Sequence, residues 1–131
     1  MVGIGPTESL PDEPATLLPP DSMWRLEEYL DMLAAVGDRT RFEIVYRLVH
    51  GGPTSPTELE ELIEVDDSTL HYHLNALLDV GLIEKRKRTE RGQECLYSYY
   101  RPTVFGEVVL TEGIEDLIRG EQEFEELYSD S

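Results

Sequence analysis

The stretch from residue 65 to residue 83 constrains the fold more than any other part of the sequence. Four leucines follow the i, i+4, i+7, i+8 spacing of a helix that buries one face: Leu70, Leu74, Leu77 and Leu78. Asp66 or Asp67 can accept hydrogen bonds from the free amides of the first turn, and Gly81 can adopt the left-handed conformation that ends a helix. We therefore expect one capped helix with one buried side.

The opposite side of this predicted helix is rich in hydrogen-bonding groups. At about 100° per residue, four side chains point away from the leucine stripe: Ser68, Tyr72, Asn75 and Asp79. Thr69 flanks that outer face, and His71 and His73 lie at the two margins of the stripe. Such groups can hydrogen-bond to base edges and phosphates. A solvated helix face explains this stretch equally well when it is taken alone.

A second, shorter helix is predicted directly before it. Ser55-Pro56-Thr57-Glu58 is a capping box with proline at the first helical position, and Leu59, Leu62 and Ile63 follow as apolar positions. Only residues 64–66 separate the two helices. Two helices joined by so short a turn, the second of them polar on its outer side, are typical of a helix-turn-helix.

After Gly81 the pattern changes to that of a β-hairpin. Residues 82–88 and 93–100 are predicted strands around a turn at 89–92, because Leu96 and the tyrosines 97, 99 and 100 favour strands. Five of the 11 basic residues of the chain fall within seven positions here: Lys85, Arg86, Lys87, Arg88 and Arg91. A cationic hairpin beside a helix-turn-helix is a wing.

The net charge of −17, from 28 acidic and 11 basic residues, would by itself argue against a nucleic-acid partner. The confinement of the cations reverses that argument, because it leaves one anion-binding surface on an acidic background. Acidic surfaces with scarce lysine are also typical of proteins that stay hydrated in molar salt. We therefore expect a halophilic source and a cytoplasmic location; an archaeal source is implied only by the family resemblance described below.

The amino-terminal part divides into an arm and two helices. Residues 1–20 contain five prolines and no apolar periodicity, which predicts a flexible arm. Asp21 or Ser22 is expected to cap a helix that runs to about Val36, and residues 39–50 form a second, buried helix. The first helix has a narrow apolar seam, which suits packing on a partner subunit or on its own domain: Met23, Leu26, Leu30 and Leu33.

The carboxyl-terminal part, 103–131, is predicted to be mostly helical. Its nine acidic residues and single basic residue make contact with DNA improbable and pairing with another subunit more plausible. The apolar positions expected at that interface are Leu110, Ile114, Leu117 and Phe124. Gly106, Gly113 and Gly120 recur every seven residues, and either allow two helices to approach closely or mark breaks in the helix.

Several classes of protein are not supported by the sequence. It contains no run of 18 apolar residues, no signal-peptide layout, no glycine-rich phosphate loop and no nucleophile–base pairing, so we expect neither a membrane protein nor an enzyme. Three scattered histidines and one cysteine predict no metal site and no cofactor. The lone Cys95 is more plausibly a small packing residue than a redox switch.

The order of these elements resembles the ArsR-type winged-helix regulators, especially those of haloarchaea. Three segments are similar to motifs of that family: Asp38-Arg39-Thr40-Arg41-Phe42-Glu43-Ile44, where Arg39 replaces the usual proline; Ser68 to Leu74; and Gly81-Leu82-Ile83-Glu84 with the basic residues after it. The resemblance covers about residues 34–102. The metal-binding half of the family's pattern is missing, because residues 57–63 contain no cysteine pair.

The resemblance implies a mainly α fold with a small β-hairpin wing, and a dimer formed by the first and last helices. Residues 1–20 would be the arm, 21–102 the DNA-binding domain and 103–131 the dimerisation helix. The implied function is sequence-specific regulation of transcription by a homodimer on palindromic double-stranded DNA. The residues expected on DNA are Ser68, Thr69, His71, Tyr72, Asn75, Lys85, Arg86, Lys87, Arg88 and Arg91. A winged-helix module that binds protein instead of DNA remains the alternative.

Overall fold

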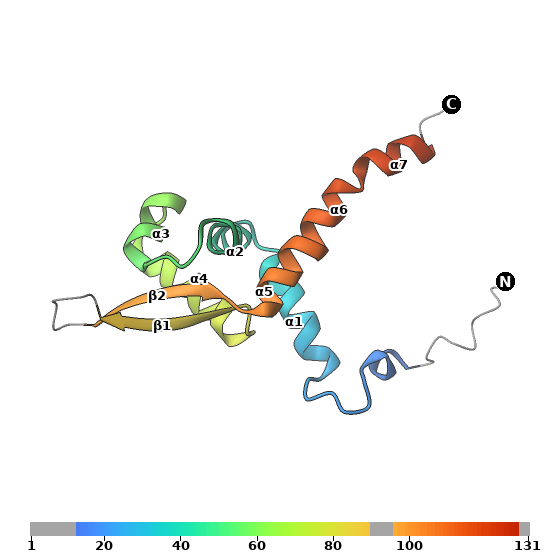
Figure 1. Cartoon of the computed structure of the whole chain (residues 1–131), viewed down its shortest axis with the longest axis horizontal. Coiled ribbons are helices and arrows are strands. Elements are labelled where there is room, and N and C mark those ends of the chain that lie inside the picture. Colours follow the sequence, from blue (N-terminus) through green and yellow to red (C-terminus); the bar gives the residue numbers. More distant parts are fainter. Residues whose placement is uncertain (1–12, 90–95, 129–131) are drawn as a thin grey trace.

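The computed structural model describes residues 13–89 and 96–128 and confirms the predicted winged helix-turn-helix (Figure 1). After a short 3-10 turn, η2 (Pro14–Leu17), come four helices and two strands. They are α1 (Leu26–Val36), α2 (Arg39–Gly51), α3 (Pro56–Ile63), α4 (Asp67–Asp79), β1 (Ile83–Thr89) and β2 (Leu96–Pro102). A carboxyl-terminal helical stretch then leads away from the domain.

The core forms where α2, α4 and the base of the hairpin meet. The inner face of α4 carries the predicted leucine stripe, of which Leu70, Leu74 and Leu77 are completely buried and Leu78 is half-buried. Apolar residues of every neighbouring element complete the cluster: Met32, Ile44, Leu48, Leu59, Leu82, Ile83, Tyr100 and Leu110. The position of α4 is therefore set by burial of its inner face against the rest of the domain.

The helix-turn-helix has the predicted caps. Ser55 accepts a hydrogen bond from the Glu58 amide (3.2 Å), and the Glu58 carboxylate accepts one from the Ser55 amide (3.1 Å). Glu64 ends α3 in the left-handed conformation (φ 59°). Asp66 then caps α4 by accepting from the Thr69 amide at 2.7 Å. Gly81, with φ of 82°, turns the chain from α4 into the hairpin as expected.

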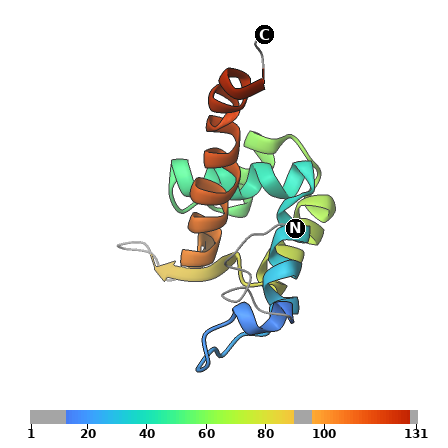
Figure 2. The ribbon, with the colours of Figure 1, turned by 90° about the vertical axis from the view of Figure 1, so that its right-hand side faces the viewer.

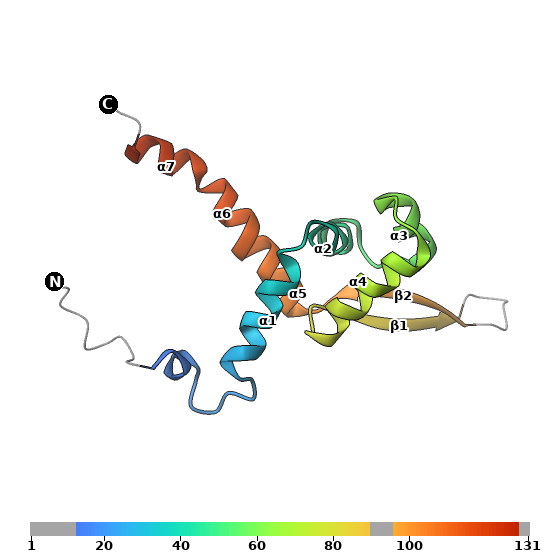
Figure 3. The ribbon, with the colours of Figure 1, turned by 180° about the vertical axis from the view of Figure 1, so that it is seen from behind.

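The wing is an antiparallel pair in which Ile83 faces Pro102 and Thr89 faces Leu96. Its second strand continues to Pro102, two residues beyond the predicted end at Tyr100, whereas the predicted start at residue 93 lies outside the described residues. Thr54 adds a single bridge to Tyr100, with N–O distances of 3.0 and 2.8 Å, which ties the loop after α2 to the hairpin. Viewed from behind, α4 crosses in front of the two strands, so helix and hairpin form neighbouring layers (Figure 3).

The first helix begins at Leu26, so the prediction of a cap at Asp21 or Ser22 was wrong. The Ser22 hydroxyl instead closes a local turn, because it accepts from the Trp24 amide (3.1 Å) and donates to the Trp24 carbonyl (2.9 Å). Such local bonds compete with helix formation. Met23 consequently lies outside the helix and is 91% exposed. Of the predicted arm, residues 13–20 fall within the described part and include η2.

The carboxyl-terminal stretch is a chain of helical segments: α5 (Val104–Val108), the π-helix η3 (Val109–Glu115), α6 (Asp116–Arg119) and α7 (Glu121–Tyr128). It leaves the core beside α1, at the end of the molecule opposite the hairpin (Figures 1 and 2). Each π turn holds about one residue more than an α turn. Leu110 and Leu117, which would share a face of an α-helix, therefore diverge, one fully buried and the other 66% exposed.

The recurring glycines have separate structural roles. A Cβ atom on Gly106 would lie 2.2 Å from the Leu82 carbonyl oxygen, so this glycine lets α5 approach the start of the hairpin. Gly113 lies within η3, and Gly120 marks the junction of α6 and α7. The close approach therefore takes place within one chain at Gly106, whereas Gly120 marks a break.

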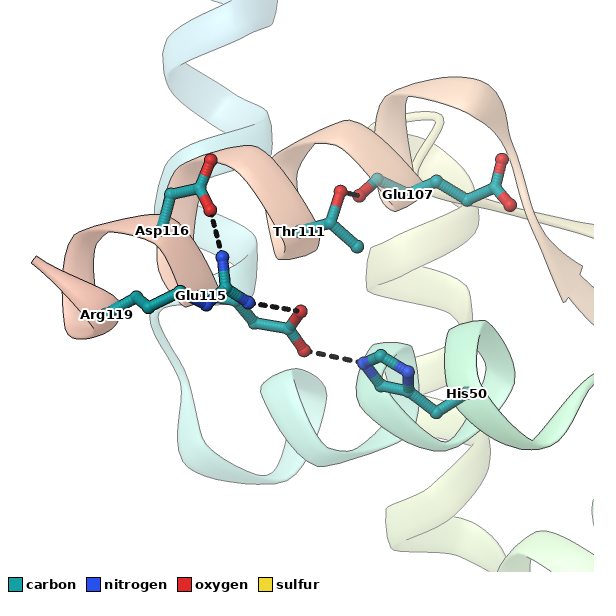
Figure 4. A network of polar contacts seen from close by, with 6 residues as sticks. All are labelled: His50, Glu107, Thr111, Glu115, Asp116 and Arg119. Carbon is teal, nitrogen blue, oxygen red and sulfur yellow. Dashed lines mark hydrogen bonds and ion pairs between the residues drawn. The ribbon is translucent and has the colours of Figure 1, made fainter.

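A polar network holds the carboxyl-terminal helix to the domain (Figure 4). His50 Nε2, at the end of α2, lies 2.6 Å from a Glu115 carboxylate oxygen, and Arg119 pairs with Asp116 in the next turn. The Thr111 hydroxyl of η3 donates to the Glu107 carbonyl of α5 at 2.8 Å. None of the helices in the described ranges is long and apolar enough to traverse a lipid bilayer.

Candidate nucleic-acid interface

The outer face of α4 presents the polar side chains that the sequence predicted there. Ser68, Tyr72 and Asn75 are exposed, Tyr72 to 67%, while Thr69 and His71 are half-buried at the edges. The helix therefore offers a phenol, an amide and hydroxyls on one accessible surface.

Two of these groups already have partners within the first turn of α4. The Ser68 hydroxyl donates to Asp66 at 3.1 Å, and His71 Nδ1 donates to the Asp67 carbonyl at 3.0 Å. Hydrogen bonds from the Thr69 amide, then from the Thr69 and Ser68 side chains, lower the pKa of Asp66 below its usual value. Asp66 therefore stays ionised, and a negative charge remains beside the amino end of this polar face.

The cations of the wing form a continuous exposed run on β1, namely Lys85, Arg86, Lys87 and Arg88. Because neighbouring side chains on a strand point to opposite faces, Arg86 and Arg88 share a face with Glu84. Lys85 and Lys87 share the face that carries Ile83 and Tyr100, whose buried side chains belong to the core. Both faces of the hairpin are therefore positively charged beyond its base.

Three of these cations have specific partners. Arg86 Nε lies 2.6 Å from the Glu84 carboxylate, which Arg101 also contacts at 3.0 Å. The hydrogen bond from Arg86, more than that from Arg101, lowers the pKa of Glu84. The Arg88 guanidinium lies 5.3 Å from the Tyr99 ring centroid, and Lys85 Nζ lies 5.9 Å from that of Tyr100. Aromatic rings thus orient two of the cations.

Helix α4 and the hairpin, which carry the two halves of the predicted nucleic-acid surface, lie in adjacent layers. Arg91 and Cys95 lie outside the residues that the structure describes, so their predicted roles stay predictions. Among the described residues, no group of three or more histidine, cysteine, aspartate or glutamate side chains could hold a metal ion.

The residues predicted for dimerisation fall into two groups. Leu30, Leu33, Leu117 and Phe124 are exposed apolar side chains at the end of the molecule opposite the wing, and Leu26 and Ile114 are half-buried. Leu110 is completely buried in the core of its own domain, so its expected place at a subunit surface is corrected. Met23 precedes α1 and is not part of a helical seam.

Two features escaped the sequence analysis. The pairing of Glu84 with Arg86 had a readable signal, because residues i and i+2 of a strand lie on one face. The hydrogen bond between Arg41 and His73 had none, because 32 residues separate them and only the packing of α2 on α4 brings them together.

Comparisons of sequence support the same architecture. A family described as a helix-turn-helix domain matches residues 36–86. An arsenical resistance operon repressor of Bacillus subtilis is 41% identical over 63 residues, which cover 48% of this chain and 60% of that protein. A putative arsenical resistance operon repressor, ArsR2, of Halobacterium salinarum is 34% identical over 95 residues, covering 72% of this chain and 73% of that protein. The match thus spans less than two thirds of the Bacillus relative.

Solved structures agree on the fold. An ArsR-like transcriptional regulator from Rhodococcus superposes with a TM-score of 0.51 at 27% identity, covering 76% of this chain and 85% of that one. A domain of Mb0332 from Mycobacterium bovis gives a TM-score of 0.59 at 21% identity, covering 92% and 96%. It is described as a homodimeric winged helix-turn-helix DNA-binding domain, and at this identity the likeness concerns the fold alone.

Proposed function

Because the chain belongs to the ArsR-type winged helix-turn-helix transcriptional regulators, we propose that it binds a palindromic double-stranded DNA operator as a homodimer. Helix α4 enters the major groove, and the hairpin grips the backbone or the minor groove. Such a regulator acts in the cytoplasm, where the DNA is.

One observation carries the proposal: Lys85 to Arg88 are four consecutive exposed cations on a chain of net charge −17, and they lie on the layer next to α4. Each phosphate neutralised by such a cation releases counterions, which is the general driving force of DNA binding. The remaining surface is acidic and repels DNA, so it limits the orientations in which the duplex can approach.

The accessible face of α4 suits direct readout of bases. Asn75 has the amide that pairs bidentately with adenine, and Ser68 and Thr69 have hydroxyls suited to base edges or phosphates. Tyr72 and His71 add a phenol and an imidazole at the centre and edge of the same face. Lys85, Arg86, Lys87, Arg88 and Arg91 are assigned to the phosphates.

The exposed leucines of α1 and the apolar residues of the carboxyl-terminal helix are assigned to the subunit interface. They lie at the end of the molecule away from the hairpin, so a two-fold axis there would leave both reading surfaces free. A dimer of this type reads half-sites about one helical turn, roughly 34 Å, apart. The homodimeric description of the Mycobacterium domain supports this arrangement.

A charge-reversal experiment tests the function. The double variant R86E/R88E and the matched control R25E/R39E each change the charge of a subunit by the same amount, but Arg25 precedes α1 and Arg39 begins α2, outside the hairpin and the carboxyl-terminal helix. Fluorescence anisotropy with the duplex upstream of the protein's own gene should show loss of binding for the first. The control should keep binding, weakened less than tenfold by the general charge effect.

Equal binding by the wing variant and the parent would contradict the proposed DNA interface. If neither the parent nor the control binds any duplex of its own genome above the non-specific level, the alternative of a protein-binding winged helix is favoured. Sedimentation of all variants at the same salt concentration checks that the wing substitutions leave the dimer intact.

A further inference from the structure

Arg41 occupies a corner where three helices meet. It lies in the first turn of α2, where its backbone amide donates to the capping carboxylate of Asp38 at 3.0 Å. Its side chain reaches in two directions: Nε donates to the Ala35 carbonyl in the last turn of α1 at 2.8 Å, and Nη1 lies 3.1 Å from Nδ1 of His73 on α4. One guanidinium thus links α1, α2 and the helix assigned to the major groove.

The chemistry of this contact specifies the state of His73. A guanidinium has only donors, so Nδ1 of His73 must be the acceptor, and the ring proton must lie on Nε2. The side chain of His73 is only 13% exposed, which limits the competition of water for that bond. The contact therefore requires a neutral imidazole in one tautomer.

Protonation would reverse the contact. The charged and titratable groups facing His73 are Arg41, the Asp38 carboxylate 3.9 Å from Nδ1, and the neighbouring Tyr72; α1 contributes the uncharged Ala35 carbonyl to the same corner. A second ring proton removes the acceptor for Arg41 and opposes two positive charges. Protonation also gives Nδ1 a proton that it can donate to the Asp38 carboxylate. The imidazole ring would then be attracted to Asp38 and repelled by Arg41.

The orientation of His73 matters for the outer face of α4. Burial of Leu70, Leu74 and Leu77 is non-directional, whereas the Arg41–His73 bond fixes one position along and around α4. The ring of Tyr72 packs edge-on against His73, with centroids 5.1 Å apart. A change at His73 is thereby passed directly to the most exposed aromatic group of the proposed reading surface.

We propose that Arg41 and His73 form a positioning link that holds α4 in its DNA-reading orientation, and that protonation of His73 releases it. His73 acts through α4 and is not itself a DNA contact. The inference rests on the proposed function, since it assigns a regulatory role to the geometry beneath that interface.

Two substitutions separate the acceptor from the ring. His73→Asn keeps an oxygen near the place of Nδ1 and cannot be protonated, whereas His73→Leu introduces an apolar side chain of similar size and removes the acceptor. Anisotropy titrations between pH 8 and pH 5.5 should show the parent losing roughly tenfold in affinity as pH falls, the size expected for a lost charged hydrogen bond. The asparagine variant should keep its affinity, and the leucine variant should be weak throughout.

Two further variants guard the conclusion. Arg41→Lys retains the positive charge, but a single ammonium group cannot reach both the Ala35 carbonyl and Nδ1 of His73. This variant should therefore bind DNA as weakly as His73→Leu, and it takes the place of His73→Leu in the test if that variant folds poorly. His50→Asn removes a histidine that contacts Glu115 on the far helix, and it should keep the pH profile of the parent. Circular dichroism at both pH values monitors folding.

Nitrogen–proton correlation spectra of the imidazole rings in the DNA-free protein test the link independently. At pH 8 we expect His73 to carry its proton on Nε2, and a proton on Nδ1 would overturn the link whatever the DNA result. If the spectra agree but His73→Leu binds DNA as tightly as the parent, the positioning role is wrong. If the parent binds no duplex at any pH, the proposed function fails together with the switch, while the spectra still decide the contact itself.

Discussion

The hairpin β1–β2 and the carboxyl-terminal helices α6 and α7 both project from the same small core, in opposite directions, and they differ in almost every physical property. The first strand of the hairpin carries four consecutive cations and packs beside α4. The helices carry five carboxylates against Arg119 alone, and they expose Leu117, Ile118, Phe124 and Leu127.

This contrast indicates that the two regions bind different kinds of partner because their charges differ. A cationic projection with few exposed apolar groups fits a polyanion, whereas an acidic one with an apolar stripe fits another protein surface once its charges are screened. Salt should therefore act on the two regions with opposite sign, weakening DNA contact and favouring contact between like-charged helices.

The largest effect is expected at the joint between the two regions. In Gly106→Ala the new methyl group would lie 2.2 Å from the Leu82 oxygen, so α5 must move away from the start of the hairpin. We expect a loss of roughly 1–3 kcal/mol in the free energy of unfolding, the range for overpacking a well-packed site. Urea denaturation measures it.

Gly113→Ala is the matched control, because nothing lies within 4 Å of the added methyl group. It should be neutral, or stabilise the helix by up to about 1 kcal/mol. Equal stability of the two alanine variants would show that Gly106 is not a contact between the regions.

Salt should give the next largest effect. As KCl rises from 0.1 to 1 M, we expect affinity for DNA to fall with a slope of about −0.9 per phosphate contact, and the dimer to become tighter. Anisotropy measures the first and sedimentation equilibrium the second.

Glu125→Gln with Glu126→Gln should reduce the salt dependence of the dimer and leave the DNA slope unchanged, because both residues lie on α7. A dimer that weakens with salt would contradict the assignment of this acidic surface to a subunit contact. The prediction of a halophilic source would lose its support with it.

Acid should destabilise the DNA-binding region. The pKa values of Asp38 and Asp66 are lowered, in each case chiefly by a backbone hydrogen bond, from Arg41 and Thr69 respectively. A lowered folded-state pKa means that the unfolded chain binds protons first, so stability is complete above about pH 4 to 5 and declines as pH falls through the folded-state values. Asp38→Asn with Asp66→Asn should flatten this decline in urea titrations at pH 7, 4.5 and 3.

The smallest effect is expected within the wing. Glu84→Gln removes the carboxylate that holds Arg86 at 2.6 Å, and should raise affinity for DNA by about twofold to threefold, as for an exposed ion pair. Glu43→Gln, which changes the charge equally but releases Arg47 on α2, should raise it less. Equal gains from both would mean that only net charge matters.

Local signals in the sequence predicted the parts of the fold that local chemistry determines. The Ser55–Glu58 box, the Asp66 cap and the leucine stripe of α4 each depend on residues within a few positions of one another. The predicted start of α1 was wrong because the Ser22 hydroxyl accepts a hydrogen bond from the Trp24 amide and does not cap a first helical turn. The surface side of α4 and the basic run on β1 were also predictable, from periodicity and charge alone.

What escaped prediction depends on contacts between distant segments or on backbone geometry. Arg41 meets His73 only after α2 has packed on α4. Leu110 looked equivalent to Leu117 because the two are seven residues apart, a spacing that places residues on one face only in a regular α-helix. No residue type in the sequence indicates the π-helical segment Val109–Glu115, in which Leu110 itself lies.

The π-helical segment η3 changes the direction in which the apolar side chains of the carboxyl-terminal helical stretch point. Within it, Leu110 is buried in the chain's own core and Ile114 packs against that core; beyond it, Leu117, Ile118, Phe124 and Leu127 are exposed. Deleting a single residue from Val109–Glu115 would rotate everything beyond by about 100°. Such a deletion during evolution would point the exposed apolar residues beyond η3 in a new direction. The protein could then form a different subunit interface while every side chain on the outer face of α4 stayed the same.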